Sequence, residues 1–137
     1  MLARIRKAME EKDEGFTLIE LLVVIIIIGI LAAIAIPVFL NQRQKGYRAD
    51  MKSTLKNAAT AIESYATERG GNYSTATVAL LVSGEGLRYD AAPAGTQTLT
   101  LPTLGANAYC FQITDSRIAG TTYKYNSDEG KPVEGTC

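Results

Sequence analysis

The 137-residue chain is long enough for one domain, or for a small domain with an extension. It contains no histidine and only two cysteines, which excludes His-based triads, histidine general bases and a four-cysteine metal cage within one chain. Lys plus Arg and Asp plus Glu both total 14, and this balance argues against a direct nucleic-acid site. We expect the protein to be no enzyme and to bind no cofactor or metal.

The N-terminal third contains a long apolar segment. Residues 1–15 are polar and carry both charge signs, and residues 16–40 follow with Glu20 as their only charged side chain. As a helix, this segment is about 37 Å long, which is enough to cross the hydrocarbon core of a bilayer. It has no polar face, and the remaining chain is too short to bury it in a soluble core. We therefore expect residues 16–40 to span a membrane.

A cleaved secretory signal peptide is an alternative interpretation of the same segment. Ala33-Ile34-Ala35 fits the small-x-small pattern of a signal peptidase site, and the mature chain would then begin at Ile36. Glu20 inside the apolar run, and a helical pattern that continues past the supposed cut, argue against this interpretation.

Beyond Leu40 the helical periodicity continues, but the helix becomes amphipathic. Its apolar positions recur at steps of three and four residues: Tyr47, Met51, Leu55, Ala58, Ala59, Ile62, Tyr65 and Ala66. Gly70-Gly71 is a strong stop signal. The pattern predicts one helix from about Thr17 to Arg69, whose apolar stripe must be covered by the rest of the chain.

Basic residues gather at the start of the amphipathic half. They are Arg43, Lys45, Arg48, Lys52 and Lys56. Asp50 is the only acid among them, whereas the chain from Asn57 onward is net acidic. Such a group can contact anionic lipid headgroups or the acidic heads of neighbouring copies, and the sequence leaves both partners open.

Residues 70–137 predict a small head. We expect a short helix at 74–82, a loop at 83–97, strands at 98–101, 109–113 and 123–125, and a turn at 126–130. An antiparallel sheet of three or four strands laid on the helical stripe would bury both apolar surfaces. The predicted fold class is therefore α+β, a long N-terminal helix packed on a small antiparallel sheet, with no room in the head for an active-site cleft.

Cys110 and Cys137 are the two cysteines. In an exported domain an even count indicates a disulfide, which would tie the last residues to the sheet, and two buried free thiols are the alternative. Lys and Arg are about equally numerous on both flanks of the apolar segment, so their distribution does not indicate which flank lies in the cytoplasm. A disulfide would place the head on the oxidising side and residues 1–15 in the cytoplasm.

Gly15-Phe16-Thr17-Leu18-Ile19-Glu20, followed at once by the apolar run, resembles the processing site of type IV prepilins and the related pseudopilins. Gly29 and Pro37 stand where type IVa-like pilins carry a helix-loosening Gly and Pro. The late cysteine pair resembles the disulfide loop of many pilins. The close resemblance covers about residues 14–48, and the 15-residue leader is longer than the shortest leaders of the type IVa class.

The resemblance implies a site made of Gly15, Phe16 and Glu20. A prepilin peptidase with methyltransferase activity would cut after Gly15 and methylate the new amine of Phe16, and Glu20 would attract that amine on a neighbouring copy. A glycine lets a peptidase approach the backbone closely, and an unpaired carboxylate in a bilayer is costly. The alternatives are an ordinary loop glycine, and a Glu20 carboxylate satisfied by water and helix-start amides. Residues 29–37 would partly unwind in a filament or form a fixed kink.

The sequence thus predicts four parts: a cleaved leader at 1–15, a membrane and filament-core helix at 16–40, its amphipathic half at 41–69, and an α+β head at 70–137. We expect a membrane-anchored precursor that an ATP-driven machine polymerises with its own copies into a surface filament. A pseudopilin of a type II secretion or DNA-uptake system is the alternative within the family. A monomeric exported or membrane-anchored binding domain is the alternative outside it.

Two further motifs in the head are weak. Asn72-Tyr73-Ser74 matches a glycosylation sequon, a short pattern that occurs often by chance. Asp115, Asp128 and Glu129 are possible calcium ligands, but they lack the dense spacing of a calcium loop.

Overall fold

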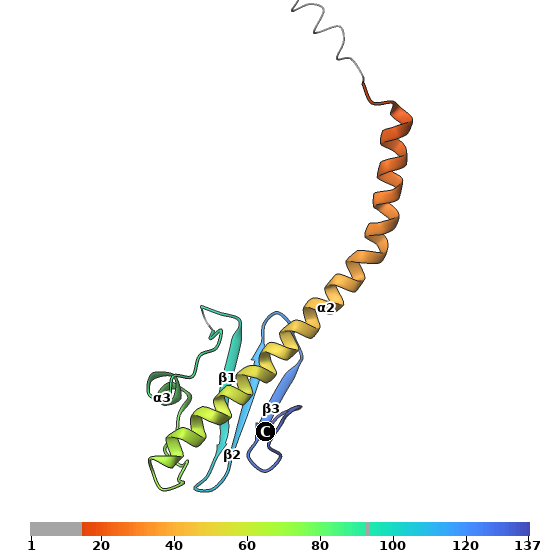
Figure 1. Cartoon of the computed structure of the whole chain (residues 1–137). Helices are drawn as coiled ribbons and strands as arrows, with labels where there is room; N and C mark the ends of the chain where they lie inside the picture. The colour runs from red at the N-terminus through yellow and green to blue at the C-terminus, as the bar shows by residue number, and fades with distance from the viewer. Residues whose placement is uncertain (1–14, 93) are drawn as a thin grey trace, which may run out of the picture. The chain divides into compact units, whose positions relative to one another are not determined.

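The computed structural model describes residues 15–92 and 94–137 (Figure 1). Nearly all of the predicted leader lies outside the described residues. The elements in chain order are α2 (Leu18–Thr67), α3 (Val78–Ser83), β1 (Gln97–Leu104), β2 (Tyr109–Asp115), β3 (Thr122–Asn126) and β4 (Pro132–Glu134). The chain divides into two compact units, the first ending at Asn41 and the second, the head unit, spanning Gln42–Cys137.

Helix α2 confirms the predicted long helix, and its first half is apolar on every side. Its large hydrophobic side chains from Leu18 to Leu40 are between 45% and 81% exposed. Among the described residues, α2 is the one helix that is long and apolar enough to span a membrane. Because apolar surface is driven out of water, this half of α2 needs lipid or other protein around it.

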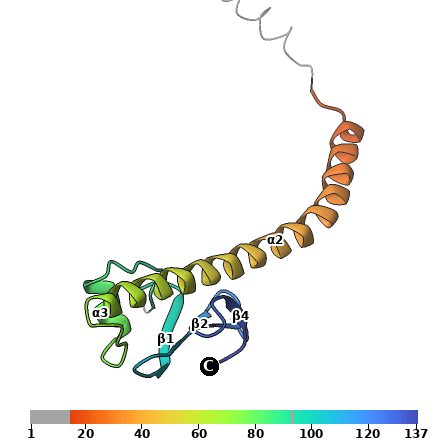
Figure 2. The same ribbon diagram turned by 60° about the horizontal axis from the view of Figure 1, so that its bottom comes forward.

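The second half of α2 packs on the sheet of the head unit, as predicted. Its stripe residues Met51, Leu55, Ala58, Ala59, Ile62, Tyr65 and Ala66 are all buried, and Tyr47 is partly buried. Figure 2 shows this part of α2 lying across one face of the sheet. Gly70 and Gly71 follow the helix with φ of 65° and 85°, and the Gly71 N–H donates to the Ala66 carbonyl over 2.8 Å. This confirms the predicted stop, since glycine adopts positive φ without a steric cost.

Four antiparallel strands form one sheet in the order β1-β2-β3-β4. Leu99, Ile113 and Tyr123 lie side by side across three strands and are all buried against α2. Strand β1 is longer than predicted, because it continues past Pro102 to Leu104 with a register shift between Thr100 and Thr103. An edge strand tolerates a proline there, since no ladder hydrogen bond is lost on its free side.

Two predicted elements of the head differ in the structure. The helix expected at 74–82 is confined to α3, because Thr77 caps it by accepting the Leu80 N–H at 3.2 Å. Residues just before it form turns, in which Asn72 Oδ1 accepts the Ser74 N–H. Strand β4 was not predicted individually, since its three residues show no alternating pattern; it pairs with β3 after the predicted turn.

Candidate functional site

The N-terminal end of α2 is closed by a reciprocal pair of side chains, Thr17 and Glu20. The Glu20 carboxylate accepts the Thr17 N–H at 2.8 Å and the Thr17 hydroxyl at 2.6 Å, and Thr17 Oγ1 accepts the Glu20 N–H at 3.3 Å. This is a capping box, which satisfies helix-start donors that have no partner within the helix. In the free chain, Glu20 is therefore held by the helix-start amide, as the alternative interpretation expected.

Thr17 was not among the predicted site residues. A sequence signal for it exists, because a Thr followed three residues later by a Glu, just before an apolar run, is the pattern of a capping box. The structure brings Thr17 and Glu20 together directly after Gly15 and Phe16, so the whole predicted processing region is one short stretch at the start of α2.

Gly15 and Phe16 are open to another protein. A Cβ placed on Gly15 would meet no atom of the described residues within 4 Å. The Phe16 side chain is 82% exposed. Both residues are therefore accessible on the described chain, and the role of Gly15 in processing stays a prediction.

Gly29 and Pro37 both lie inside α2, which is helical without a break from Leu18 to Thr67. Pro37 has no N–H to donate to the carbonyl four residues earlier, so the ladder lacks one bond at this point. A Cβ on Gly29 would also meet open space. The unwinding expected for residues 29–37 stays a prediction about the assembled protein.

The structure joins Cys110 and Cys137 in a disulfide, with their Cα atoms 6.0 Å apart. Cys110 is buried on β2, and the Cys137 N–H donates to Gln112 Oε1 on the same strand at 3.3 Å. The bridge therefore holds residues 135–137 against the sheet.

A polar clamp, made of Asp50, Gln97, Asp115 and Arg117, fastens α2 to the sheet. The Arg117 guanidinium donates to Asp115 at 2.9 Å and to Asp50 at 3.0 Å, and the Asp115 side chain is fully buried. The hydrogen bonds from Arg117 hold the pKa of Asp115 below its usual value. The same contacts, led by Asp115, raise the pKa of Arg117.

Gln97 completes the clamp at the start of β1. Its Nε2 donates to Asp50 at 3.0 Å, and its Oε1 accepts the Thr54 hydroxyl at 2.9 Å. Gln97 and Thr54 are both buried, so each must find a partner, and each finds it across the helix–sheet interface.

Two of the three acidic residues considered as calcium ligands form ion pairs with basic side chains. Asp115 belongs to the clamp, and Glu129 pairs with Lys124 at 3.2 Å. Over residues 15–92 and 94–137, no group of three His, Cys, Asp or Glu side chains comes close enough to hold a metal. The structure thus does not bring Asp115, Asp128 and Glu129 together.

Two tyrosines share the Glu63 carboxylate on α2. The hydroxyls of Tyr73 and Tyr109 donate to its two oxygens at 2.8 Å and 2.9 Å. Burial, followed by the bond to Glu63, raises the pKa of Tyr109, and the Glu63 bond raises the pKa of Tyr73. The rings of Tyr73 and Tyr109 pack edge to face with centroids 5.0 Å apart. These tyrosines serve packing in the head unit.

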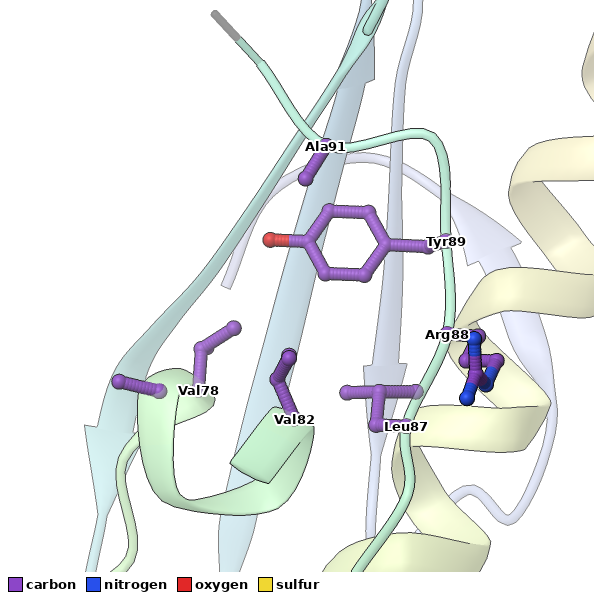
Figure 3. Close-up of a pocket in the computed structure, with 7 residues that line it drawn as sticks. Val78, Val82, Leu87, Arg88, Tyr89 and Ala91 are labelled. Carbon is purple, nitrogen blue, oxygen red and sulfur yellow. The ribbon is translucent and has the colours of Figure 1, made fainter. Parts of the chain in front are cut away.

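An open pocket of about 620 Å³ lies between α3 and residues 87–91 (Figure 3). Val78 and Val82 point from α3 toward the Tyr89 ring, and Arg88 points to the other side of the segment. The lining has no carboxylate or thiol to work with Arg88 or Tyr89. The pocket therefore offers space at the surface of the head but no acid–base pair.

Residues 12–36 match the family described as the prokaryotic N-terminal methylation motif. The chain is 51% identical over 61 residues to "Prepilin peptidase-dependent protein D" of Escherichia coli (strain K12), a match covering 44% of this chain and 42% of that protein. It is 47% identical over 58 residues to "Type IV major pilin protein PilA" of Myxococcus xanthus (strain DK1622), covering 42% of this chain and 26% of that protein.

A longer match extends into the head. The chain is 38% identical over 97 residues to "Type IV wide pilus major component PilA4" of Thermus thermophilus, and the match covers 71% of this chain and 70% of that protein. The Escherichia and Myxococcus matches instead span less than half the length of those relatives.

Proposed function

From the premise that this chain belongs to the type IV pilin family, we propose that it is the structural subunit of a type IV pilus-like filament, made first as a membrane-anchored precursor. Its role is structural rather than enzymatic, as in the pilus components it resembles. The proposed parts are a leader at 1–15, a core helix at 16–40, its amphipathic continuation at 41–69 and a head at 70–137.

The observation that carries this proposal is the exposed apolar half of α2. Burying one large aliphatic side chain is worth about 1.5–3 kcal/mol, so a helix half that exposes such side chains throughout is unstable in water. Lipid covers it in the precursor, and the same halves of other copies cover it in the filament. The head unit already has its own core, so it forms the filament surface without refolding.

Gly15, Phe16 and Glu20 serve processing and docking in this proposal. A prepilin peptidase cuts at the accessible Gly15-Phe16 bond and methylates the new amine, and an ATP-driven machine assembles the subunits. In the free chain the Glu20 carboxylate is bonded to Thr17, beside the position where the amine is created. The Phe16 amine of a neighbouring copy then supplies the charge that an intramembrane carboxylate needs.

The first test of this proposal is the N-terminus of the mature protein. Mass spectrometry of chain purified from cells with a prepilin peptidase should find a methylated Phe16. A start at Ile36 would instead indicate a secreted domain, and an uncut chain a membrane-tethered one. Electron microscopy then separates long surface filaments from the short filaments of a pseudopilin.

Gly15→Leu should block this cleavage, because the side chain keeps the peptidase from the backbone. The precursor should accumulate in the membrane with its leader attached. Gly46→Leu is a matched control, since Gly46 also faces open space on the described chain but lies far along α2 from the cut. If Gly15→Leu is still shortened by the mass of the leader, the assignment of the site is wrong.

A further inference from the structure

Four cations form a continuous stripe on α2 of the head unit. Lys45, Arg48, Lys52 and Lys56 follow one another at steps of three, four and four residues, which places them along one side of a helix. All four side chains are exposed. We call this surface the basic stripe.

The one acid that lies among these cations in the sequence makes no ion pair with any of them in the described part of the chain. Asp50 is bonded to Arg117 and Gln97 in the polar clamp, and it stands two residues from Arg48 and from Lys52, a spacing that does not bring side chains together on a helix. Lys52 lies 5.0 Å from the centre of the Tyr123 ring, a contact that positions the amine and leaves its charge unneutralised. Within residues 15–92 and 94–137, no stripe cation lies within ion-pair distance of a carboxylate.

The stripe begins close to the end of the apolar segment in the chain. Lys45 and Arg48 follow Leu40 by five and eight residues of helix, a rise of about 7 Å and 12 Å. The headgroup layer is about 5–8 Å thick on each side of a bilayer. The Debye length is about 8 Å at physiological ionic strength, so both cations stay within reach of headgroup charge.

We propose that the basic stripe, led by Lys45 and Arg48, binds the phosphate groups of anionic lipids in the membrane-anchored precursor. This inference rests on the proposed function, because it requires the apolar segment to be in the bilayer. A membrane anchor keeps these cations beside lipid headgroups in every precursor, whereas carboxylates of another copy come within reach only on assembly. Lipid is therefore the partner that the position of the stripe favours over an acidic protein face.

A test uses the full chain reconstituted in phosphatidylcholine vesicles, with and without phosphatidylglycerol. The protein has no tryptophan, so Ala49→Trp, an exposed position beside Lys45 and Arg48, adds a single fluorescent reporter. Energy transfer from this tryptophan to a dansyl headgroup lipid should be greater in the anionic vesicles and should fall at high salt. Each cation near the membrane surface raises the equilibrium constant for headgroup binding roughly fivefold. K45Q/R48Q should therefore lower this equilibrium constant by about 25-fold.

R88Q/K131Q is the matched control, since it also removes one Arg and one Lys, both exposed on the head unit outside the stripe. It should keep the lipid-dependent signal. Equal loss in the two double variants would overturn the inference. Transfer that is the same in neutral vesicles and rises with the protein-to-lipid ratio would assign the stripe to another copy and also overturn it. A chain that does not float with either kind of vesicle would refute the proposed membrane anchor itself, and this inference with it.

Discussion

Glu20 has one partner in the structure and a second in the proposed filament. In the free chain its carboxylate closes the helix start through Thr17. In the proposed cleaved subunit, the same carboxylate is the only charged side chain of residues 16–40, and we propose that it attracts a buried amine. Since a capping role and a docking role both use this one group, variants of Thr17 and Glu20 separate them.

Glu20→Ala should reduce filament yield roughly tenfold or more, because the Phe16 amine of a neighbour then lacks its partner in a medium of low dielectric. Thr17→Ala should have a small effect, since it loses only a helix cap, worth about 1 kcal/mol. Glu20→Gln should be intermediate at best. The measurement is sheared filament against total cell-associated subunit, and leader removal should stay normal in all three variants. A filament yield from Glu20→Ala equal to that of the wild type would contradict the docking role of Glu20.

Asp115 makes the stability of the head unit depend on acid pH. Its pKa is held below the ordinary value of 3.8 by Arg117, so its charged form stabilises the folded state above that value. This stabilisation is lost as the pH falls below 3.8 and passes through the lower folded pKa. Denaturant unfolding of the full chain in detergent should show that loss, and Asp115→Asn should be less stable at neutral pH with a flatter acid limb. An unchanged acid limb would exclude Asp115 as its source.

At the scale of elements, residues 135–137 follow the last strand and depend on β2. Strand β4 has only three residues and pairs with one neighbour, so its own ladder contributes few contacts. The bridge from Cys110 to Cys137 closes a segment with a sequence separation of 27 and restricts the unfolded chain.

Cys110→Ser or Cys137→Ser should therefore destabilise the head unit by up to about 3.5 kcal/mol, the chain-entropy value for a loop of this length. Protease cleavage of the chain after β3 should also become faster, because β4 and residues 135–137 lose their tie to β2. Reduction of the wild-type protein should reproduce both effects. Two reactive thiols per chain in denatured, unreduced protein would contradict the bridge.

At the scale of the whole molecule, one helix serves two different environments. The half up to Leu40 exposes its apolar side chains, whereas the half within the head unit buries one stripe against β1, β2 and β3. The same type of side chain therefore has opposite roles in the two halves. Leu22 is 45% exposed and Leu55 is 0% exposed.

Leu55→Ala should cost about 2–5 kcal/mol of head-unit stability, because it opens a cavity under the sheet. Leu22→Ala makes the same chemical change and should leave unfolding of the head unit nearly unaltered, while it weakens filament packing. Unfolding followed by the near-ultraviolet signal of the head tyrosines measures the first effect, and filament yield measures the second. Equal destabilisation of the head unit by both variants would contradict the division of α2.

Much of this protein follows from the sequence because its strongest signals are local. The length of α2, its apolar half, its buried stripe and its stop at Gly70-Gly71 depend on residues within a few turns of one another. Alternating side chains likewise predict the first three strands. The stretch from Gly15 to Glu20 identifies the candidate site. The three-residue spacing from Thr17 to Glu20 is also the pattern of a capping box.

Only the tertiary structure decides which distant groups meet. Asp50 and Arg117 are 67 positions apart, and Glu63 and Tyr109 are 46 apart, so no periodicity predicts either pair. The length of α3, the pairing of β4 and the pocket beside Tyr89 likewise depend on neighbours supplied by packing. The steps between the basic residues already place them on one side of a helix, whereas only the structure shows that Asp50 pairs with Arg117. Local patterns specify the helices and strands. The hydrogen-bond and ion-pair partners are decided by tertiary folding, because only folding brings side chains that are distant in sequence within a few ångströms of one another.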